Sequence, residues 1–240
     1  MLELKPERFD LREYGAQRVT VSGRAMIADQ SGALYWSSED ALIVADMHLE
    51  KGSHFARRGQ MLPPYDTRAT LLALARAIDT YDAQNIILLG DSFHDIDGPS
   101  RLTPEDREIL AILQEDCDWF WVTGNHDPAL PETIGGHVLD ELVIGGLTLR
   151  HEPVAAPVTH EIAGHLHPAA RISLYGHALR RPCFIGNSRR IVLPAFGAYT
   201  GGLNVLDQAF VPLFGTDGFN VCMMGHEGLY PVASRLLRGD

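Results

Sequence analysis

The first half of the chain alternates short apolar runs with longer segments of helical spacing. Buried strands are predicted at 41–45, 85–89 and 119–122, where apolar residues are consecutive and largely branched or aromatic. The segments 67–80 and 103–114 repeat apolar residues at the spacing that is typical of helices. This alternation of strand and helix predicts a mainly parallel sheet that is covered by helices.

Two details of these helices can be predicted. The helix over 103–114 begins with Thr103, a good cap, followed by Pro104 at the first helical position. Asp66 is expected to cap the helix over 67–80. The residues of that helix predicted to share its buried face are Leu71, Leu72, Ala75 and Ile78.

The other apolar segments are short, and turns that contain glycine separate them. Strands are expected within 24–46 and at 142–149, 161–166, 171–175 and 190–193. We expect the later ones to form a second sheet packed on the first. The predicted fold is of the α/β class, with residues 1–240 in a single domain, because a chain of this length can bury one large core.

The composition is that of an ordinary globular protein, with 45% hydrophobic and 21% charged residues. The first residues lack the layout of a secretory signal, and no apolar run approaches the ~20 residues of a membrane helix. We therefore expect a cytoplasmic protein without a membrane segment. Three cysteines without a Cys-x-x-Cys pair suggest neither a disulfide framework nor a zinc knuckle.

A formal charge of −11 argues against broad electrostatic attraction to nucleic acid. Divalent cations bound by some of the acids would reverse the sign of the local charge. Basic residues also cluster, at Lys51, Arg57 and Arg58, at Arg180 and Arg181, and at Arg189 and Arg190. The first cluster follows a predicted ligand motif closely, so Lys51, Arg57 and Arg58 are candidate substrate-binding residues, and the other two are interpreted as solvated surface.

Residues with metal-binding chemistry follow the predicted strands in five motifs. These motifs are Asp46-Met-His48, Gly90-Asp91, Gly124-Asn125-His126-Asp127, His151, and Gly164-His165-Leu166-His167. Three of them stand at the ends of predicted parallel strands, and such ends converge on one crevice. Asp46 and His48, if extended, would project to the same side, as would His165 and His167. His151 is preferred over His137, His160 and His177 because a predicted strand ends at it.

This residue set predicts two divalent metal ions. Mixed oxygen and imidazole ligands suit Mn, Fe or Zn, whereas magnesium sites rarely use so many histidines. Asp91, after the central strand, is the candidate bridging carboxylate. Two ions ~3.5–4 Å apart can clamp the attacking and leaving oxygens of a phosphoryl group, so a phosphoesterase is predicted.

The order of the motifs resembles that of the calcineurin-like metallophosphoesterase superfamily. The resemblance implies a two-sheet β-sandwich flanked by helices in α-β-β-α layers. It also implies the role of each site residue. One metal would be held by Asp46, His48 and His167, the other by Asn125, His151 and His165, with Asp91 bridging and His126 acting on substrate as a general acid.

Two further likenesses point to DNA. Gly90-Asp91 is followed by His94, as in double-strand-break repair exonucleases, where that histidine assists catalysis. The stretches 46–51, 149–153 and 193–202 resemble the bacterial DNA-ligase-associated metallophosphoesterases, which are Mn-dependent DNA endonucleases or phosphodiesterases linked to repair. The likeness implies Mn²⁺ as cofactor, a single-stranded or end-exposed DNA substrate, and a functional link to a DNA ligase and a helicase.

Other functions stay open on the sequence alone. Cyclic nucleotides or other small phosphodiesters, and phosphomonoesters, are alternative substrates. A non-catalytic scaffold with the same fold is a further alternative, although the presence of His126 argues against it, because a scaffold needs no general acid. Strand preference, the native metal and the oligomeric state are not determined by these patterns.

Overall fold

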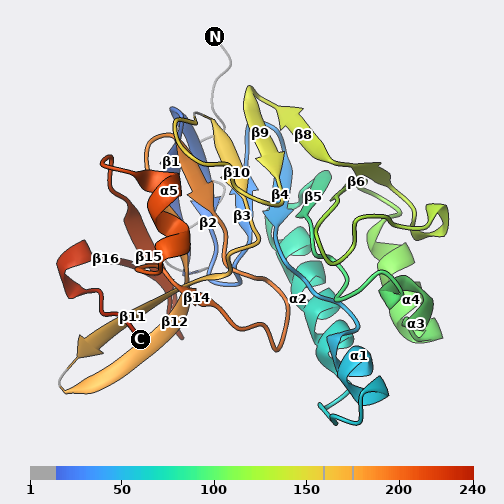
Figure 1. The fold of residues 1–240 in the computed structure, drawn as a ribbon. Coiled ribbons are helices and arrows are strands. Elements are labelled where there is room, and N and C mark those ends of the chain that lie inside the picture. The colour runs from blue at the N-terminus through green and yellow to red at the C-terminus, as the bar shows by residue number, and fades with distance from the viewer. Residues whose placement is uncertain (1–14, 159, 175) are drawn as a thin grey trace.

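The computed structural model describes residues 15–158, 160–174 and 176–240. Two β-sheets pack face to face, and helices cover the outer face of the first sheet while a short helix lies over the second (Figure 1). This is the predicted fold class and layer order. Within these residues, no helix combines the length and the apolar character that a membrane crossing requires.

The first sheet contains seven strands in chain order. They are β1 (Gln17–Val21), β2 (Arg24–Ala28), β3 (Leu34–Trp36), β4 (Ala41–Val44), β5 (Asn85–Leu89), β6 (Asp118–Val122) and β7 (His137–Leu139). From β4 to β7 the neighbours run parallel, but β1 to β4 form an antiparallel meander. The prediction of a mainly parallel sheet was therefore wrong for its first half, because short turns join these strands where a parallel pair would need a long crossover.

The second sheet is built from the rest of the chain. Its strands are β8 (Glu141–Ile144), β9 (Leu147–Arg150), β10 (Glu161–Ala163), β11 (Pro168–Leu174), β12 (His177–Gly186), β13 (Arg190–Val192), β14 (Leu203–Asn204), β15 (Asn220–Met224) and β16 (Leu229–Val232). The predicted strand at 142–149 is instead a hairpin that turns at Gly145 and Gly146, both with positive φ. Of the strand expected at 171–175, Tyr175 lies outside the described residues.

The helices lie mainly beside the first sheet. They are α1 (Lys51–Arg57), α2 (Asp66–Tyr81), α3 (Gly98–Arg101), α4 (Pro104–Leu113) and α5 (Val211–Phe214). The cap of α4 is as predicted, since the Thr103 hydroxyl accepts from the Asp106 N–H at 3.1 Å. Asp66 is not a cap. It is the first residue of α2, and its carboxylate accepts from the Gly52 N–H of α1 at 2.8 Å.

The face that α2 buries also differs by one position from the prediction. Leu71, Leu74 and Ala77 are buried, whereas Leu72 is 44% exposed. The predicted face was rotated about the helix because four apolar residues within one turn left more than one choice. The face that is buried is determined by the packing of α2 on the sheet and on α4.

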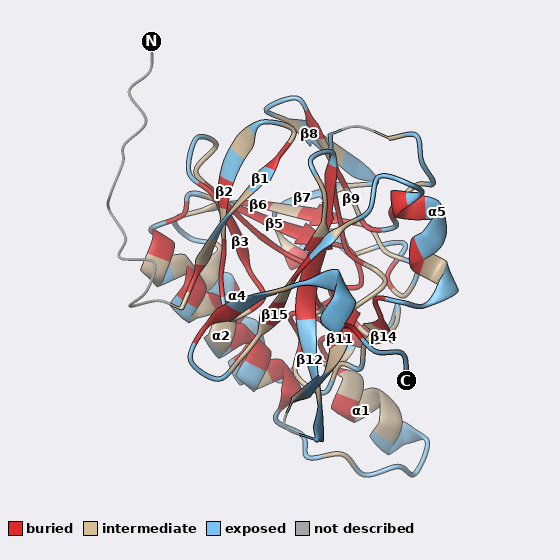
Figure 2. Cartoon of the chain, turned by 90° about the vertical axis from the view of Figure 1, so that its left-hand side faces the viewer, coloured by how far each residue is buried: buried red, intermediate tan, exposed pale blue. Residues whose placement is uncertain are grey.

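The uninterrupted apolar runs of the central strands are explained by burial on both faces. Leu88 of β5 packs with the helices, while Ile87 and Leu89 pack against the second sheet. Figure 2 shows buried residues concentrated in the strands, whereas the far end of the β11–β12 hairpin is largely exposed. Rigid strands therefore hold the loops that follow them, and these loops carry the polar motifs.

Candidate metal centre

The carboxyl ends of parallel strands from both sheets meet at one end of the sandwich. In the first sheet, β4 and β5 run parallel and lead into Asp46 and Asp91, and β6 leads into the turn at 124–127. In the second sheet, β9 and β10 run parallel and lead into His151 and His165. The predicted convergence of strand ends thus involves both sheets.

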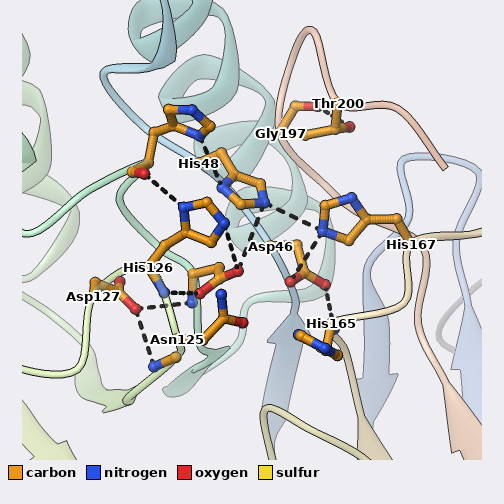
Figure 3. A network of polar contacts seen from close by, with 12 residues as sticks. Asp46, His48, Asn125, His126, Asp127, His165, His167, Gly197 and Thr200 are labelled. Atoms are coloured by element: carbon orange, nitrogen blue, oxygen red, sulfur yellow. Dashed lines mark hydrogen bonds and ion pairs between the residues drawn. The ribbon is translucent and has the colours of Figure 1, made fainter. Parts of the chain in front are cut away.

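The first group of possible ligands comprises Asp46, His48 and His167. The Nε2 atoms of His48 and His167 lie 3.2 Å apart. Nε2 of His167 lies 3.3 Å from Oδ1 of Asp46. Figure 3 shows these side chains turned toward one another, although a long stretch of chain separates His167 from the other two. They are the residues that the superfamily resemblance assigns to one metal.

The second group comprises Asp91, His151 and His165. Nε2 of His151 lies 3.4 Å from Oδ1 of Asp91 and 3.0 Å from Nδ1 of His165. Oδ1 of Asn125 is also 3.0 Å from this Nε2. The Nδ1–H of His151 donates to the carbonyl of Leu89 at 3.0 Å, which leaves Nε2 to face the group.

The alternatives to His151 lie elsewhere. His137 stacks on Phe120 at the edge strand β7, with ring centroids 5.3 Å apart. His177 begins β12 and is exposed, and His160 precedes β10. Among the described residues, none of these three belongs to a group of possible metal ligands.

Asp91 lies between the two groups. Its Oδ1 faces His151, while its Oδ2 lies 3.9 Å from Nε2 of His48. A carboxylate that presents one oxygen to each group is placed to bridge two ions. The bridging role stays a prediction, and this geometry is compatible with it.

A buried oxygen without a partner indicates that the first group fits a cation. Asp46 is fully buried, and its Oδ1 has no hydrogen-bond partner, while its Oδ2 accepts from the His165 N–H at 2.8 Å. Imidazole nitrogens of His167 and His151 lie 3.3 and 3.7 Å from this Oδ1 without forming a hydrogen bond. A charged oxygen that is buried without a hydrogen bond is costly, and a cation would compensate it. Burial, reinforced by His167, lowers the pKa of His48 to about 2, so this imidazole is neutral and able to ligate a metal.

The backbone of the ligand residues is not extended. Asp46 (φ 54°), His48 (φ 45°), Asp91 (φ 47°), His165 (φ 70°) and His167 (φ 44°) all adopt left-handed conformations. The prediction that paired ligands project from extended segments was therefore wrong. The side chains converge because the chain turns back sharply after each strand, in conformations that cost about 1–3 kcal/mol per residue and cluster at functional sites.

Two glycines of the motifs allow the strand ends to approach. A Cβ on Gly124 would lie 2.2 Å from the backbone nitrogen of Asp91 and 2.3 Å from its Oδ1. A Cβ on Gly90, which has φ 70°, would lie 2.5 Å from the His151 ring. At each of these positions glycine is therefore required, because a residue of another motif occupies the space that a Cβ would need.

Asp127 supports the turn from beneath. Its carboxylate accepts from the N–H groups of Asp91, Phe93 and Gly124, each at 3.0 Å. Burial raises the pKa of Asp127 to about 6. Its oxygens thus accept hydrogen bonds from the backbone, which leaves Asn125 and His126 to face the centre.

His126 presents one ring nitrogen to the site. Its Nδ1–H donates to the carbonyl of His94 at 2.7 Å, and its Nε2 lies 4.0 Å from Oδ2 of Asp91. Its side chain is 39% exposed, unlike the buried ligand candidates His48 and His151. The imidazole is therefore fixed in orientation and accessible from solvent.

His94 stands beside His126 in a cluster of rings. The two rings stack with centroids 5.1 Å apart, and Phe55 stacks on His94 at 5.6 Å. The Nδ1 atoms of His94 and His48 lie 3.4 Å apart. Burial, followed by the nearby charge of Lys51, lowers the pKa of His94 to about 4. Nitrogens of His48, His94 and His126 lie close enough together to form a third group of possible ligands.

A polar network behind His94 was not predicted. Nδ1 of His54 hydrogen-bonds to Asp95, and Arg101 binds the same carboxylate through two nitrogens at 2.7 and 2.8 Å. Burial opposes ionisation of Asp95, but the bonds from Arg101 and His54 outweigh it and lower its pKa. The ring of His54 meets that of His94 edge-on at 4.7 Å. The sequence signal was weak, because the short helix α1 that carries His54 has no strong apolar period.

The three basic candidates lie on or just after α1 and differ in their surroundings. Lys51 is half-buried, and its charge reaches the imidazoles of His48 and His94. Arg57 is mostly exposed and forms an ion pair with Asp97 at 3.6 Å. Arg58 follows the helix and is exposed. Of the three, Lys51 lies nearest to the metal groups.

Comparison with known proteins supports this interpretation of the fold. The chain is similar to the crystal structure of the Pseudomonas putida nuclease MPE, with 28% sequence identity and a TM-score of 0.71. That match covers 90% of this chain and 100% of the nuclease. This chain has a metallophosphoesterase-type fold. This match is consistent with the resemblance to the metallophosphoesterase superfamily that the motifs show.

Other comparisons add less. The YfcE phosphoesterase from E. coli matches with 12% identity and a TM-score of 0.40, over 80% of this chain and 98% of YfcE. A search with protein-family models gave no match, and neither did a search of the curated proteins.

The close approach at Gly124 leads to a first prediction. Gly124→Ala should displace Asp91 and lower the affinity for divalent metal about 10- to 100-fold, as expected when the support of a ligand is disturbed. Gly239→Ala is the matched control, because a Cβ there meets nothing within 4 Å. Metal content after dialysis against limiting Mn²⁺ measures the effect, and equal metal content in both variants would contradict the prediction.

Proposed function

We propose that this metallophosphoesterase is a DNA endonuclease that hydrolyses phosphodiester bonds with two divalent metal ions. The observation that carries the proposal is the pair of adjacent ligand groups with Asp91 between them and the accessible Nε2 of His126 beside them. The similarity to a bacterial nuclease over nearly the whole chain supports nucleic acid as the substrate. Together these findings support a metal-dependent phosphoesterase whose substrate is DNA.

The proposed ligand assignment follows the two groups. Asp46, His48 and His167 would hold one ion, Asn125, His151 and His165 would hold the other, and Asp91 would contribute to both. Carboxylate, amide and imidazole ligands together suit Mn²⁺, with Fe or Zn as alternatives. When bound, two such ions activate water and stabilise the negative charge that develops on the phosphate.

His126 is placed to act as the general acid. Its Nδ1–H is held by the carbonyl of His94, so a proton for the leaving oxygen would come from Nε2, which points to Asp91 and the metal groups. His94 keeps the His126 ring in position through the stack and the carbonyl contact. A protonated leaving oxygen matters most where the leaving group is a poor one, such as the deoxyribose alkoxide of DNA.

The surroundings favour an extended substrate. His126 is accessible from solvent, and the exposed Arg57 and Arg58 follow the half-buried Lys51 at the other end of α1. An exposed backbone phosphate of a single strand could therefore reach the ligand groups while neighbouring phosphates meet these cations. A role in DNA repair alongside a DNA ligase and a helicase is part of the proposal, based on the likeness of the stretches 46–51, 149–153 and 193–202.

The direct test of the proposal is cleavage of a labelled single-stranded oligonucleotide by the purified protein with Mn²⁺. We expect internal cleavage that stops on chelation and weakens gradually with salt, by a slope of about 0.7 in log units for each phosphate contacted. A nucleoside monophosphate should be a poor substrate. Intact DNA together with rapid turnover of the monophosphate would overturn the nuclease assignment.

Removing the general acid should separate chemistry from metal binding. His126→Ala should retain the metals and lower kcat for DNA by about 10²–10⁴, the range for loss of a positioned proton donor. The loss should be much smaller for bis-p-nitrophenyl phosphate, whose leaving group needs no proton. His226→Ala, in the exposed turn between β15 and β16, is the control. Equal losses on both substrates would argue against acid catalysis by His126.

A further inference from the structure

A small hollow opens beside the metal centre on the side away from His126. Its volume is about 120 Å³. Its lining includes His167, Arg180, Arg181, Thr200, Gly201 and Gly202. Because His167 belongs to a ligand group, the hollow adjoins the metal centre, and two arginines line it.

The loop at 194–202 forms one wall and is fixed to the ligand residues by backbone bonds. The N–H of Gly197 donates to the carbonyl of Asp46 at 3.2 Å, and the N–H of Leu203 donates to that of His167 at 3.0 Å. Between these anchors Thr200 binds Gly197 through its hydroxyl at 2.8 Å, and Figure 3 shows both beside His167. The loop therefore has a defined position relative to the metal centre.

The two arginines have different partners. Arg180 donates to the carbonyl of Gly202 at 2.5 Å and pairs with Asp240 at 3.3 Å, so it braces the end of the loop. Arg181 is exposed and donates to the Arg180 carbonyl at 3.0 Å. Among the described residues, no carboxylate forms an ion pair with Arg181, so its charge is available to an anion.

An exposed aromatic ring completes the surface. Tyr199 precedes the lining residue Thr200 and is 46% exposed. Its backbone is left-handed, with φ 61°, a conformation that a bulky residue rarely adopts. The loop thus exposes a tyrosine directly before Thr200, which lines the hollow together with Arg181, in a conformation for which glycine would be the unstrained choice.

We propose that Arg181 and Tyr199 form a subsite for the nucleotide next to the cleaved phosphodiester of a single-stranded nucleic acid. A hollow of about 120 Å³ is well below the ~300–1,000 Å³ of pockets that enclose a drug-sized ligand, so it admits a phosphate but not a whole nucleotide. The base therefore lies outside, stacked on Tyr199, while Arg181 binds the phosphate. Cationic groups combined with an aromatic platform are typical of single-strand binding. This inference rests on the proposed DNA substrate.

Substitution of Arg181 tests the phosphate contact. Arg181→Ala should lower kcat/KM for a single-stranded oligonucleotide about ten-fold and reduce the salt slope by about 0.7, the loss of one phosphate contact. Turnover of bis-p-nitrophenyl phosphate, which does not reach the subsite, should stay within two-fold of wild type. Arg189→Ala is the matched control, because it changes the net charge equally. Arg189 is a half-exposed arginine that precedes β13, whereas the loop at 194–202 follows that strand.

Substitution of Tyr199 tests the stacking contact. Tyr199→Ala should weaken oligonucleotide cleavage about 5- to 150-fold, the range for loss of one stacked base, and Tyr199→Phe should restore it. Tyr199→Gly also removes the ring, and glycine adopts the observed φ of 61° without strain. A loss in both the Ala and Gly variants therefore reports the ring rather than a disturbed loop.

The outcomes distinguish this inference from the function on which it rests. Wild-type protein that hydrolyses the small diester but no oligonucleotide would overturn both. Normal DNA cleavage by Arg181→Ala and Tyr199→Ala, as by Arg189→Ala, would overturn the subsite alone. Equal losses on the oligonucleotide and the small diester would assign both residues to the integrity of the metal centre, and would also overturn the subsite.

Discussion

Two buried carboxylates, Asp46 and Asp91, impose the constraint on which the rest of the site depends. Both lie almost entirely out of contact with solvent, and one oxygen of Asp46 lacks any hydrogen-bond partner. The groups that face them are imidazoles, and His48 is held neutral by burial. At His167 burial opposes protonation, but Asp46 outweighs it and raises the pKa of this ring. A single imidazolium cannot balance two buried carboxylates, whereas divalent cations held between the rings and the carboxylates can. Burial therefore raises the free energy of the site without metal, and so favours the binding of divalent cations.

The two-sheet architecture satisfies this constraint by meeting at one end. Parallel strands of the first sheet deliver Asp46 and Asp91, and parallel strands of the second deliver His151 and His165. The sharp left-handed turns that follow the strands add local strain, which the buried strands on either side can sustain. Glycines at the points of closest approach, such as Gly90 of the first sheet against His151 of the second, remove the side chains that would keep the two sheets apart.

Much of this arrangement could be predicted because it depends on local patterns. Apolar runs predicted β4, β5 and β6, and the motif order predicted the metallophosphoesterase-type fold. The meander of β1 to β4 is local, since short turns join its strands, but the alternation of strand and helix that follows favoured a parallel sheet. The pairing of β12 with β15 joins segments that are distant in the chain, which short-range patterns do not encode. His54 was missed for a similar reason, since its contacts with Asp95 and His94 join a helix to a separate loop.

The metal centre itself is tested most directly by electron paramagnetic resonance of the purified protein loaded with Mn²⁺. If the Asp91 carboxylate is shared between two ions, titration should saturate at two Mn²⁺ per chain. The spectrum at saturation should then be that of an exchange-coupled pair. Saturation at one ion, or two ions with the spectrum of isolated Mn²⁺, would contradict the dinuclear centre.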